Sequence, residues 1–167
     1  MKRPVIFVVM DGVGISESSY GNAVLNAYTP TLDQLRKGPF TQLKAHGLAV
    51  GLPSDEDMGN SEVGHNAIGC GQIYSQGAKL VNESIADGSI YQSETWKEVS
   101  DNAKKSTLHL IGLLSDGNVH SNIEHVISML KQAKKEGLKK VRLHILLDGR
   151  DVPATSALDY VNQLEEV

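Results

Sequence analysis

Five side chains in this sequence stand where they could do chemistry: Asp11, Ser61, His120, Arg150 and Asp151. Asp11 directly follows an apolar run, and a carboxylate held at the end of a buried strand suits Mg²⁺, Mn²⁺ or one Zn²⁺. Arg150 can hold a carboxylate or a phosphate through two hydrogen bonds. Its neighbour Asp151 could accept a proton from a hydroxyl. These residue types favour a polar site.

Ser61 lies in the stretch MGNSEVGH, residues 58–65, at the predicted start of a helix. The free N–H groups and the dipole of a helix start stabilise negative charge, so an alkoxide or a phosphate ester would be favoured there. The alternative is that Ser61 or Asn60 only caps the helix, and the local sequence favours this reading. The stretch lacks the second glycine of a nucleophile elbow. His65 falls on the same helix face as Ser61, where a packing or hydrogen-bonding role is the simpler interpretation.

Three predicted strands each end in the pair Asp-Gly, at Asp11, Asp116 and Asp148. Ligands of parallel α/β sheets bind at the carboxyl ends of the strands, so acidic residues there would face a functional edge. Asp-Gly is also a good turn pair, which is the alternative explanation for each case alone. The repetition, with further polar residues just beyond, favours a site.

The elements that must position these residues follow from apolar periodicity and from turn signals. The second half is the clearer, because strand, helix and strand with short connections predict a parallel βαβ unit. The predicted class is therefore α/β with a mostly parallel sheet. The expected strands are 5–10, 41–50 (weaker), 107–114 and 141–147; the expected helices are 29–38, a short one from 61, 77–87, 93–105, 122–136 and one from near 154 that continues to the last residue.

Composition excludes several classes of protein. The 167 residues are 40% hydrophobic and 22% charged, as in soluble globular proteins, and suffice for one domain with a sizeable core. The net charge of −4 argues against a nucleic-acid partner. The single cysteine, Cys70, cannot form an intramolecular disulfide. The amino-terminal apolar run is too short for a signal sequence or a membrane span, so a cytoplasmic protein without a membrane partner is expected.

Four ordered stretches carry a resemblance to a known family. MDGVG at 10–14, MGNSEVGHNAIGCG at 58–71, SDGNVHS at 115–121 and LDGRDVPATS at 147–156 resemble successive motifs of the cofactor-independent phosphoglycerate mutases, in the alkaline phosphatase superfamily. The resemblance implies a three-layer α/β fold. It also implies interconversion of 3-phosphoglycerate and 2-phosphoglycerate through a phosphoserine, with two divalent metal ions and without 2,3-bisphosphoglycerate. Mn²⁺ is the expected metal, with Mg²⁺ or Co²⁺ as alternatives.

Residue roles carry over by motif. The resemblance implies that Ser61 is the nucleophile and that Ser61 and Asp11 are ligands of one metal ion. It implies that His120, Arg150 and Asp151 bind the glycerate, with Asp151 a candidate base for its hydroxyls. A metal ion would lower the pKa of the serine hydroxyl and neutralise the phosphoryl oxygens.

Members of the family are much longer than 167 residues, and their remaining metal ligands lie in the carboxy-terminal half. The resemblance therefore implies a fragment that is inactive alone and has the rest of the same protein as its partner. Residues 1–74 would belong to the metal-binding phosphatase domain, and residues 75–167 would begin the inserted phosphotransferase domain. Two alternatives remain: another phosphomutase or phosphatase of the superfamily, and a non-catalytic module that binds glycerate or phosphate.

Overall fold

The structure is a computed structural model that describes residues 3–167, and it divides into two compact units, Met1–Leu43 and Lys44–Val167. The first unit contains the short helices α1 (Ala23–Asn26) and α2 (Pro30–Arg36). Asn22 caps α1, because its side-chain oxygen accepts from the N–H of Leu25 at 3.0 Å. Pro30 opens α2, where a missing N–H costs nothing, so the predicted helix at 29–38 is confirmed.

The strand predicted at residues 5–10 is not formed, and this prediction was wrong. Val5 is 93% exposed and Met10 is 44% exposed. A strand needs a neighbour to accept its backbone hydrogen bonds, and residues 3–167 place no paired strand beside this segment. Residues 5–10 thus have the amino-acid composition of a buried strand but no neighbouring strand to pair with. The weaker strand predicted at 41–50 was also wrong, because the segment ends in the 3₁₀ helix η1 (Gly47–Val50).

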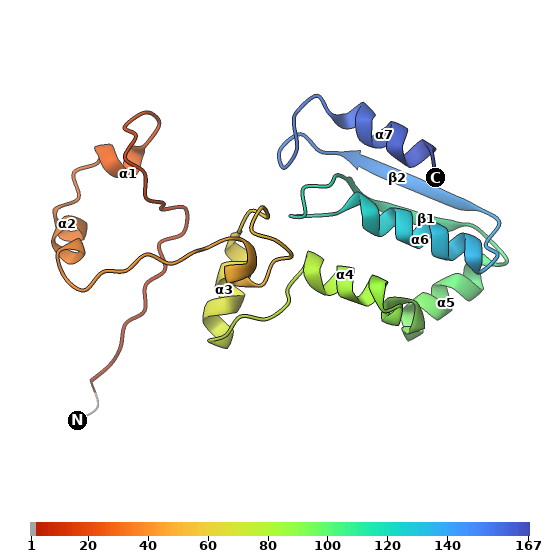
Figure 1. Cartoon of the computed structure of the whole chain (residues 1–167), viewed down its shortest axis with the longest axis horizontal. Coiled ribbons are helices and arrows are strands. Elements are labelled where there is room, and N and C mark those ends of the chain that lie inside the picture. The colour runs from red at the N-terminus through yellow and green to blue at the C-terminus, as the bar shows by residue number, and fades with distance from the viewer. Residues whose placement is uncertain (1–2) are drawn as a thin grey trace. The chain divides into compact units, whose positions relative to one another are not determined.

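The second unit holds the predicted α/β arrangement, seen in Figure 1 from the yellow α3 to the blue α7. The helix predicted to run to the last residue instead ends at Glu165, capped by Glu166. The other helices and strands predicted after residue 60 are confirmed to within a few residues. The elements after residue 60 are α3 (Ser61–Cys70), α4 (Ala78–Ala86), α5 (Glu94–Ala103), β1 (Leu108–Leu114), α6 (Ile123–Lys135), β2 (Val141–Leu147) and α7 (Ala157–Glu165). The 3₁₀ helix η2 (Ser89–Gln92), between α4 and α5, was not predicted.

Strands β1 and β2 pair in parallel, from Leu108 opposite Val141 to Leu114 opposite Leu147, without a bulge. Helix α6 makes the crossover between them and lies alongside the sheet in Figure 1. Because the register is even, both strands end at the same edge, and the loops that follow them start side by side. The predicted α/β class with a parallel sheet is confirmed; within residues 3–167 this sheet comprises two strands.

Two apolar clusters hold the sheet and its helices together. At one end, Ala103, Leu108, Ala133 and Leu138 join α5, β1 and α6. At the other end, Leu114, Ile123 and Ile127 pack against side chains of α7, including Tyr160 and Leu164. The second cluster lies directly beneath the strand-end loops, so it fixes the base from which those loops project.

A third cluster, of Val50, Leu52 and Val63, joins η1 to α3. The buried amide of Gln76 supports it by donating to the carbonyl of Val50 at 2.9 Å. Contacts divide the chain after Leu43, and the domain boundary expected between residues 74 and 75 stays a prediction. None of the helices formed by residues 3–167 combines the length and apolar character needed to cross a membrane.

Candidate functional site

Ser61 is the first residue of α3, as the sequence predicts, and the cap of that helix is its neighbour Asn60. The side-chain oxygen of Asn60 accepts from the N–H of Val63 at 3.1 Å. The capping role therefore belongs to Asn60, and the exposed hydroxyl of Ser61 stands at the positive end of the helix dipole. Such a position suits an oxygen that carries or acquires negative charge.

His65 contacts Ser61 from one turn further along α3. Its Nδ1 lies 2.7 Å from the carbonyl oxygen of Ser61 and 3.2 Å from the hydroxyl oxygen. A carbonyl oxygen can only accept, so Nδ1 carries the proton in this contact. In that tautomer Nδ1 cannot take a proton from the hydroxyl, so His65 is not arranged as the base for Ser61.

The loop before Ser61 is held by close backbone packing. A Cβ on Gly59 would lie 1.8 Å from the carbonyl oxygen of Ala45, and a Cβ on Gly51 would lie 1.9 Å from that of Tyr74. Real Cβ atoms do not approach oxygen so closely, so both positions require glycine. This packing fixes the path of the chain into α3, and with it the place of Ser61.

The loop after β2 is organised by one carboxylate. The Oδ1 atom of Asp148 accepts from the N–H groups of Gly149, Arg150 and Asp151, at 2.7, 2.9 and 3.2 Å. Its Oδ2 accepts from the hydroxyl of Ser115, which follows β1, at 2.6 Å. The hydrogen bond from Ser115, together with those from the backbone, lowers the pKa of Asp148 to about 2.

The loop after β1 lies against the loop after β2. A Cβ added to Gly117 would be 2.7 Å from the Cβ of Asp151. Asp116 of the same loop accepts from the hydroxyl of Tyr160 on α7 at 2.7 Å, and this bond raises the pKa of the tyrosine. The two loops that carry His120, Arg150 and Asp151 are thus brought together, as expected for the ends of parallel strands.

A further contact joins these loops to the segment before Ser61. The side-chain amide of Asn118 donates to Asp57 at 2.7 Å and accepts from Asn122 at 2.6 Å. Burial disfavours the charged form of Asp57, but hydrogen bonds from Ser54 and Asn118 outweigh it and lower its pKa. Sequence reasoning missed Asp57 and Asn118, because two separate polar loops carry no signal that they meet.

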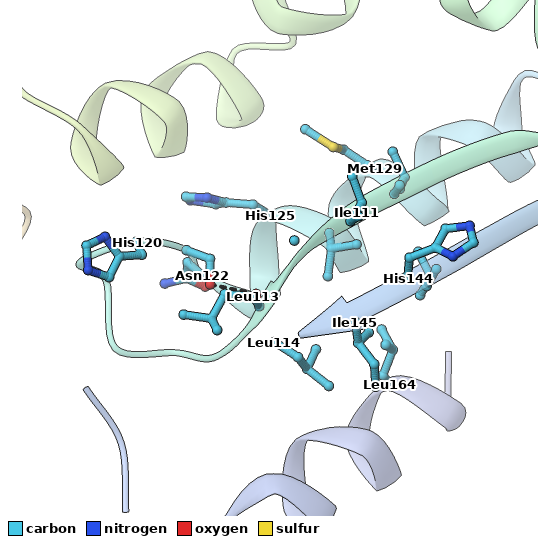
Figure 2. Close-up of a pocket in the computed structure, with 15 residues that line it drawn as sticks. Ile111, Leu113, Leu114, His120, Asn122, His125, Met129, His144, Ile145 and Leu164 are labelled. Atoms are coloured by element: carbon cyan, nitrogen blue, oxygen red, sulfur yellow. Dashed lines mark hydrogen bonds between the residues drawn. The ribbon is translucent and has the colours of Figure 1, made fainter. Parts of the chain in front are cut away.

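A cavity of about 340 Å³ lies between the sheet and α6 (Figure 2). Figure 2 shows His120 from the loop after β1 at one end, with Asn122 and His125 of the α6 start and Ile111 and Met129 nearby. Burial lowers the pKa of His125, whose Nε2 lies 2.6 Å from the side-chain oxygen of Asn82. Of the five candidate residues only His120 lines this mainly apolar cavity. The cavity is therefore not the place where the five candidate residues would meet.

Asp11, the last of the predicted site residues, belongs to the first unit, whereas the other four belong to the second. The carboxylate of Asp11 and the hydroxyl of Ser61 are hard oxygen donors, which is the ligand type that Mg²⁺ and Mn²⁺ prefer. Within residues 3–167, no cluster of three or more His, Cys, Asp or Glu side chains forms a metal cage. The oxygen donors of Asp11 and Ser61 fit a divalent ion, but these two residues alone would supply only part of its ligands.

The structure shows which hydrogen bonds the aspartates of the Asp-Gly pairs after β1 and β2 make. Asp148 holds the turn that follows it, and Asp116 is bound by Tyr160. The turn alternative therefore explains Asp148, whereas the carboxylate of Asp116 links its loop to α7. The polar site expected at this edge stays a prediction, on His120, Arg150 and Asp151, which the two loops carry.

Comparisons with known proteins identify the family. A protein in Leptospira interrogans named as a probable 2,3-bisphosphoglycerate-independent phosphoglycerate mutase is 55% identical over 98% of this chain. An Arabidopsis thaliana protein, 2,3-bisphosphoglycerate-independent phosphoglycerate mutase 1, is 48% identical over 98%. The chain spans 31% and 30% of the length of these two relatives.

A solved structure of Leishmania mexicana phosphoglycerate mutase at low cobalt concentration is 49% identical and matches with a TM-score of 0.77. That match covers 84% of this chain and 26% of the solved chain. The family model described as "BPG-independent PGAM N-terminus" matches residues 81–167, just over half of the sequence. The chain therefore belongs to the family of 2,3-bisphosphoglycerate-independent phosphoglycerate mutases, and corresponds to their N-terminal part.

Proposed function

We propose that this chain is the N-terminal part of an enzyme that interconverts 3-phosphoglycerate and 2-phosphoglycerate through a phosphoserine at Ser61. The observation that carries the proposal is the joining of three loops. The loops after β1 and β2, with His120, Arg150 and Asp151, lie against each other and are hydrogen-bonded to the segment before Ser61 through Asn118 and Asp57. The residues proposed as the nucleophile and as the glycerate-binding cluster therefore belong to one compact unit, which supports the proposal.

In the proposed reaction the Ser61 oxygen loses its proton and attacks phosphorus, the bond from phosphorus to the substrate oxygen breaks, and that oxygen takes up a proton to become a hydroxyl of glycerate. The released glycerate stays bound, turns, and takes the phosphoryl group back on its other hydroxyl. Arg150 would hold the carboxylate of the glycerate as a bidentate partner. Asp151 would accept the proton of the attacking glycerate hydroxyl, and His120 would help to orient the sugar-acid chain.

Divalent metal ions complete the proposal. Asp11 and Ser61 would hold one ion, with Mn²⁺ the preferred metal and Mg²⁺ or Co²⁺ as substitutes, and a second ion would be held outside this chain. When bound, the ions would neutralise phosphoryl charge and favour the ionised serine oxygen. The Leishmania relative was solved at low cobalt concentration, which supports a divalent metal. The names of the relatives support independence from 2,3-bisphosphoglycerate.

The partner that we propose is the remainder of a longer protein, in keeping with a chain that spans about a third of its relatives. Exposed apolar side chains also support such a partner, among them Val5 and Ile6 near the start and Ile111 and Leu146 on the sheet. Leaving such surface in water is unfavourable, and a covering segment would remove it. We also propose a cytoplasmic protein, and that the 167 residues alone do not turn over substrate.

The test uses the full-length protein that carries this segment, with 3-phosphoglycerate and Mn²⁺ and without 2,3-bisphosphoglycerate. We expect Ser61→Ala to abolish formation of 2-phosphoglycerate while calorimetry still detects substrate binding. Ser106→Ala, at an exposed serine that donates to Asn102, is the matched control and should keep full turnover. Unchanged turnover of Ser61→Ala would refute the nucleophile, and robust turnover by the 167 residues alone would refute the need for the remainder.

A further inference from the structure

The carboxylate of Asp148 is the centre of a hydrogen-bond network that reaches both the loop after β1 and the loop after β2. It accepts three backbone N–H groups from its own loop and one hydroxyl from Ser115. Because two of those N–H groups belong to Arg150 and Asp151, the carboxylate fixes the backbone from which both side chains project. Hydrogen bonds to a charged group are about twice as strong as neutral ones, so these four donors restrain the turn.

Ser115 transmits the same constraint to the loop after β1. It is 1% exposed, and its hydroxyl oxygen accepts from the N–H of Gly117 at 3.0 Å while its proton goes to Asp148. One hydroxyl thus connects the start of the His120 loop to the turn that carries Arg150. The close approach of Gly117 to Asp151 leaves little room for either loop to move independently.

We propose that Asp148 and Ser115 are positioning residues that keep the glycerate bound while the phosphoryl group resides on Ser61. This inference rests on the proposed function. Neither residue touches the reacting atoms in this scheme; each acts through the placement of Arg150, Asp151 and the His120 loop. The same pair thereby decides between phosphoryl transfer back to glycerate and loss of the phosphoryl group to water.

The chemistry of that choice is simple. If glycerate leaves early, a water oxygen forms the new bond to phosphorus, the bond from phosphorus to the Ser61 oxygen breaks, and a water proton restores the serine hydroxyl. The products are inorganic phosphate and glycerate instead of 2-phosphoglycerate. Weaker retention of glycerate therefore appears as a higher ratio of phosphate to 2-phosphoglycerate, which a general loss of folded enzyme does not produce.

The experiment measures both products in the full-length enzyme with Mn²⁺ and 3-phosphoglycerate. We expect Ser115→Ala to raise KM and the phosphate ratio about tenfold, as for loss of one charge-assisted hydrogen bond. Asp148→Ala loses all four hydrogen bonds to the carboxylate and should raise both quantities further. Asp148→Asn keeps an oxygen for the three N–H groups but loses the acceptor for Ser115, so it should fall between these variants and the wild type.

The matched control is Asp87→Ala. Asp87 also holds a turn, since its carboxylate accepts from the N–H of Ser89 at 2.8 Å, but it lies between α4 and η2, away from the strand-end loops. It should leave the product ratio unchanged. If Asp148→Ala fails to fold, as judged by circular dichroism, the ratios of Ser115→Ala and Asp148→Asn decide the question.

The outcomes separate the two proposals. An active wild type with Asp148 and Ser115 variants that share the product ratio of Asp87→Ala would overturn the positioning role and leave the mutase intact. A wild type that makes no 2-phosphoglycerate would overturn the proposed function itself.

Discussion

Asn118 offers a direct test of how the Ser61 segment and the loop after β1 are joined. Its side chain makes two hydrogen bonds, to Asp57 at 2.7 Å and from Asn122 at 2.6 Å. It is also the only residue other than glycine with a positive φ in the described chain, at 60°. Asparagine tolerates this conformation better than alanine does. Replacing Asn118 therefore has two separable effects: the loss of its side-chain hydrogen bonds and a change in backbone strain.

The expected magnitude follows from these contacts. A hydrogen bond to a charged group is worth about 1.5–3 kcal/mol and a neutral one about 0.5–1.5 kcal/mol, and partial exposure favours the lower values here. Asn118→Ala loses both bonds and places alanine in the left-handed region, which adds about 1 kcal/mol. We expect Asn118→Ala to lower the free energy of unfolding by about 3 kcal/mol, and Asn118→Gly to cost about 1 kcal/mol less.

The assay is urea denaturation of the 167-residue chain at pH 7, followed by far-ultraviolet circular dichroism. Asn162→Ala, at an exposed position of α7, is the control and should stay within about 0.5 kcal/mol of the wild type. If Asn118→Ala and Asn118→Gly both unfold at the wild-type urea concentration, the link between Asp57 and the loop after β1 contributes nothing and our reasoning is refuted. If glycine is no better than alanine, the left-handed backbone is not the source of strain.

Three further predictions concern the Ser61 loop, the core and the metal. Gly59→Ala forces the backbone away from Ala45 and should destabilise the chain by about 3 kcal/mol, whereas Gly69→Ala, with open space around it, should not; urea denaturation of both variants compares them. Glu136 accepts from Ser100, from Trp96 and from Gln132, and although burial opposes its ionisation these bonds lower its pKa below 4.5. A group whose pKa is lowered by folding stabilises the fold at pH values above its pKa in the unfolded chain. Glu136→Ala should therefore lower the free energy of unfolding by about 2 kcal/mol at pH 7, and by progressively less as the pH falls below 4.5. An equal loss of stability at pH 7 and well below pH 4.5 would contradict this. Removing divalent ions from the full-length enzyme with a chelator should abolish mutase turnover, and Mn²⁺ should restore it; activity that survives complete chelation would argue against the metal.

The second half of the fold could be predicted from sequence because its signals are local. Helix α6 (Ile123–Lys135) has a capping residue in Asn122, an apolar face and a basic last turn, and the strands on either side are bounded by turn residues. These features act within a few residues of each other, so pattern alone locates them. The parallel pairing then follows from the length of the crossover.

The start of the chain could not be predicted in the same way. An apolar run such as residues 5–10 indicates that the segment favours a buried environment. Whether it forms a strand depends on a pairing partner elsewhere in the protein. The network of Asp148 and Ser115 was hidden for a related reason. The pattern showed an acidic residue after each strand, but not that a buried serine of one loop would bind the carboxylate of the other.

The most direct test of the central claim is to trap the phosphoenzyme. Full-length enzyme is mixed with Mn²⁺ and 3-phosphoglycerate, quenched in acid within the turnover time, digested, and its peptides are analysed by mass spectrometry. Our account predicts one phosphoryl group on the peptide that contains MGNSEVGH, located at Ser61, and none in Ser61→Ala. A phosphoryl group on another residue, or an active enzyme that never carries one at Ser61, would contradict it.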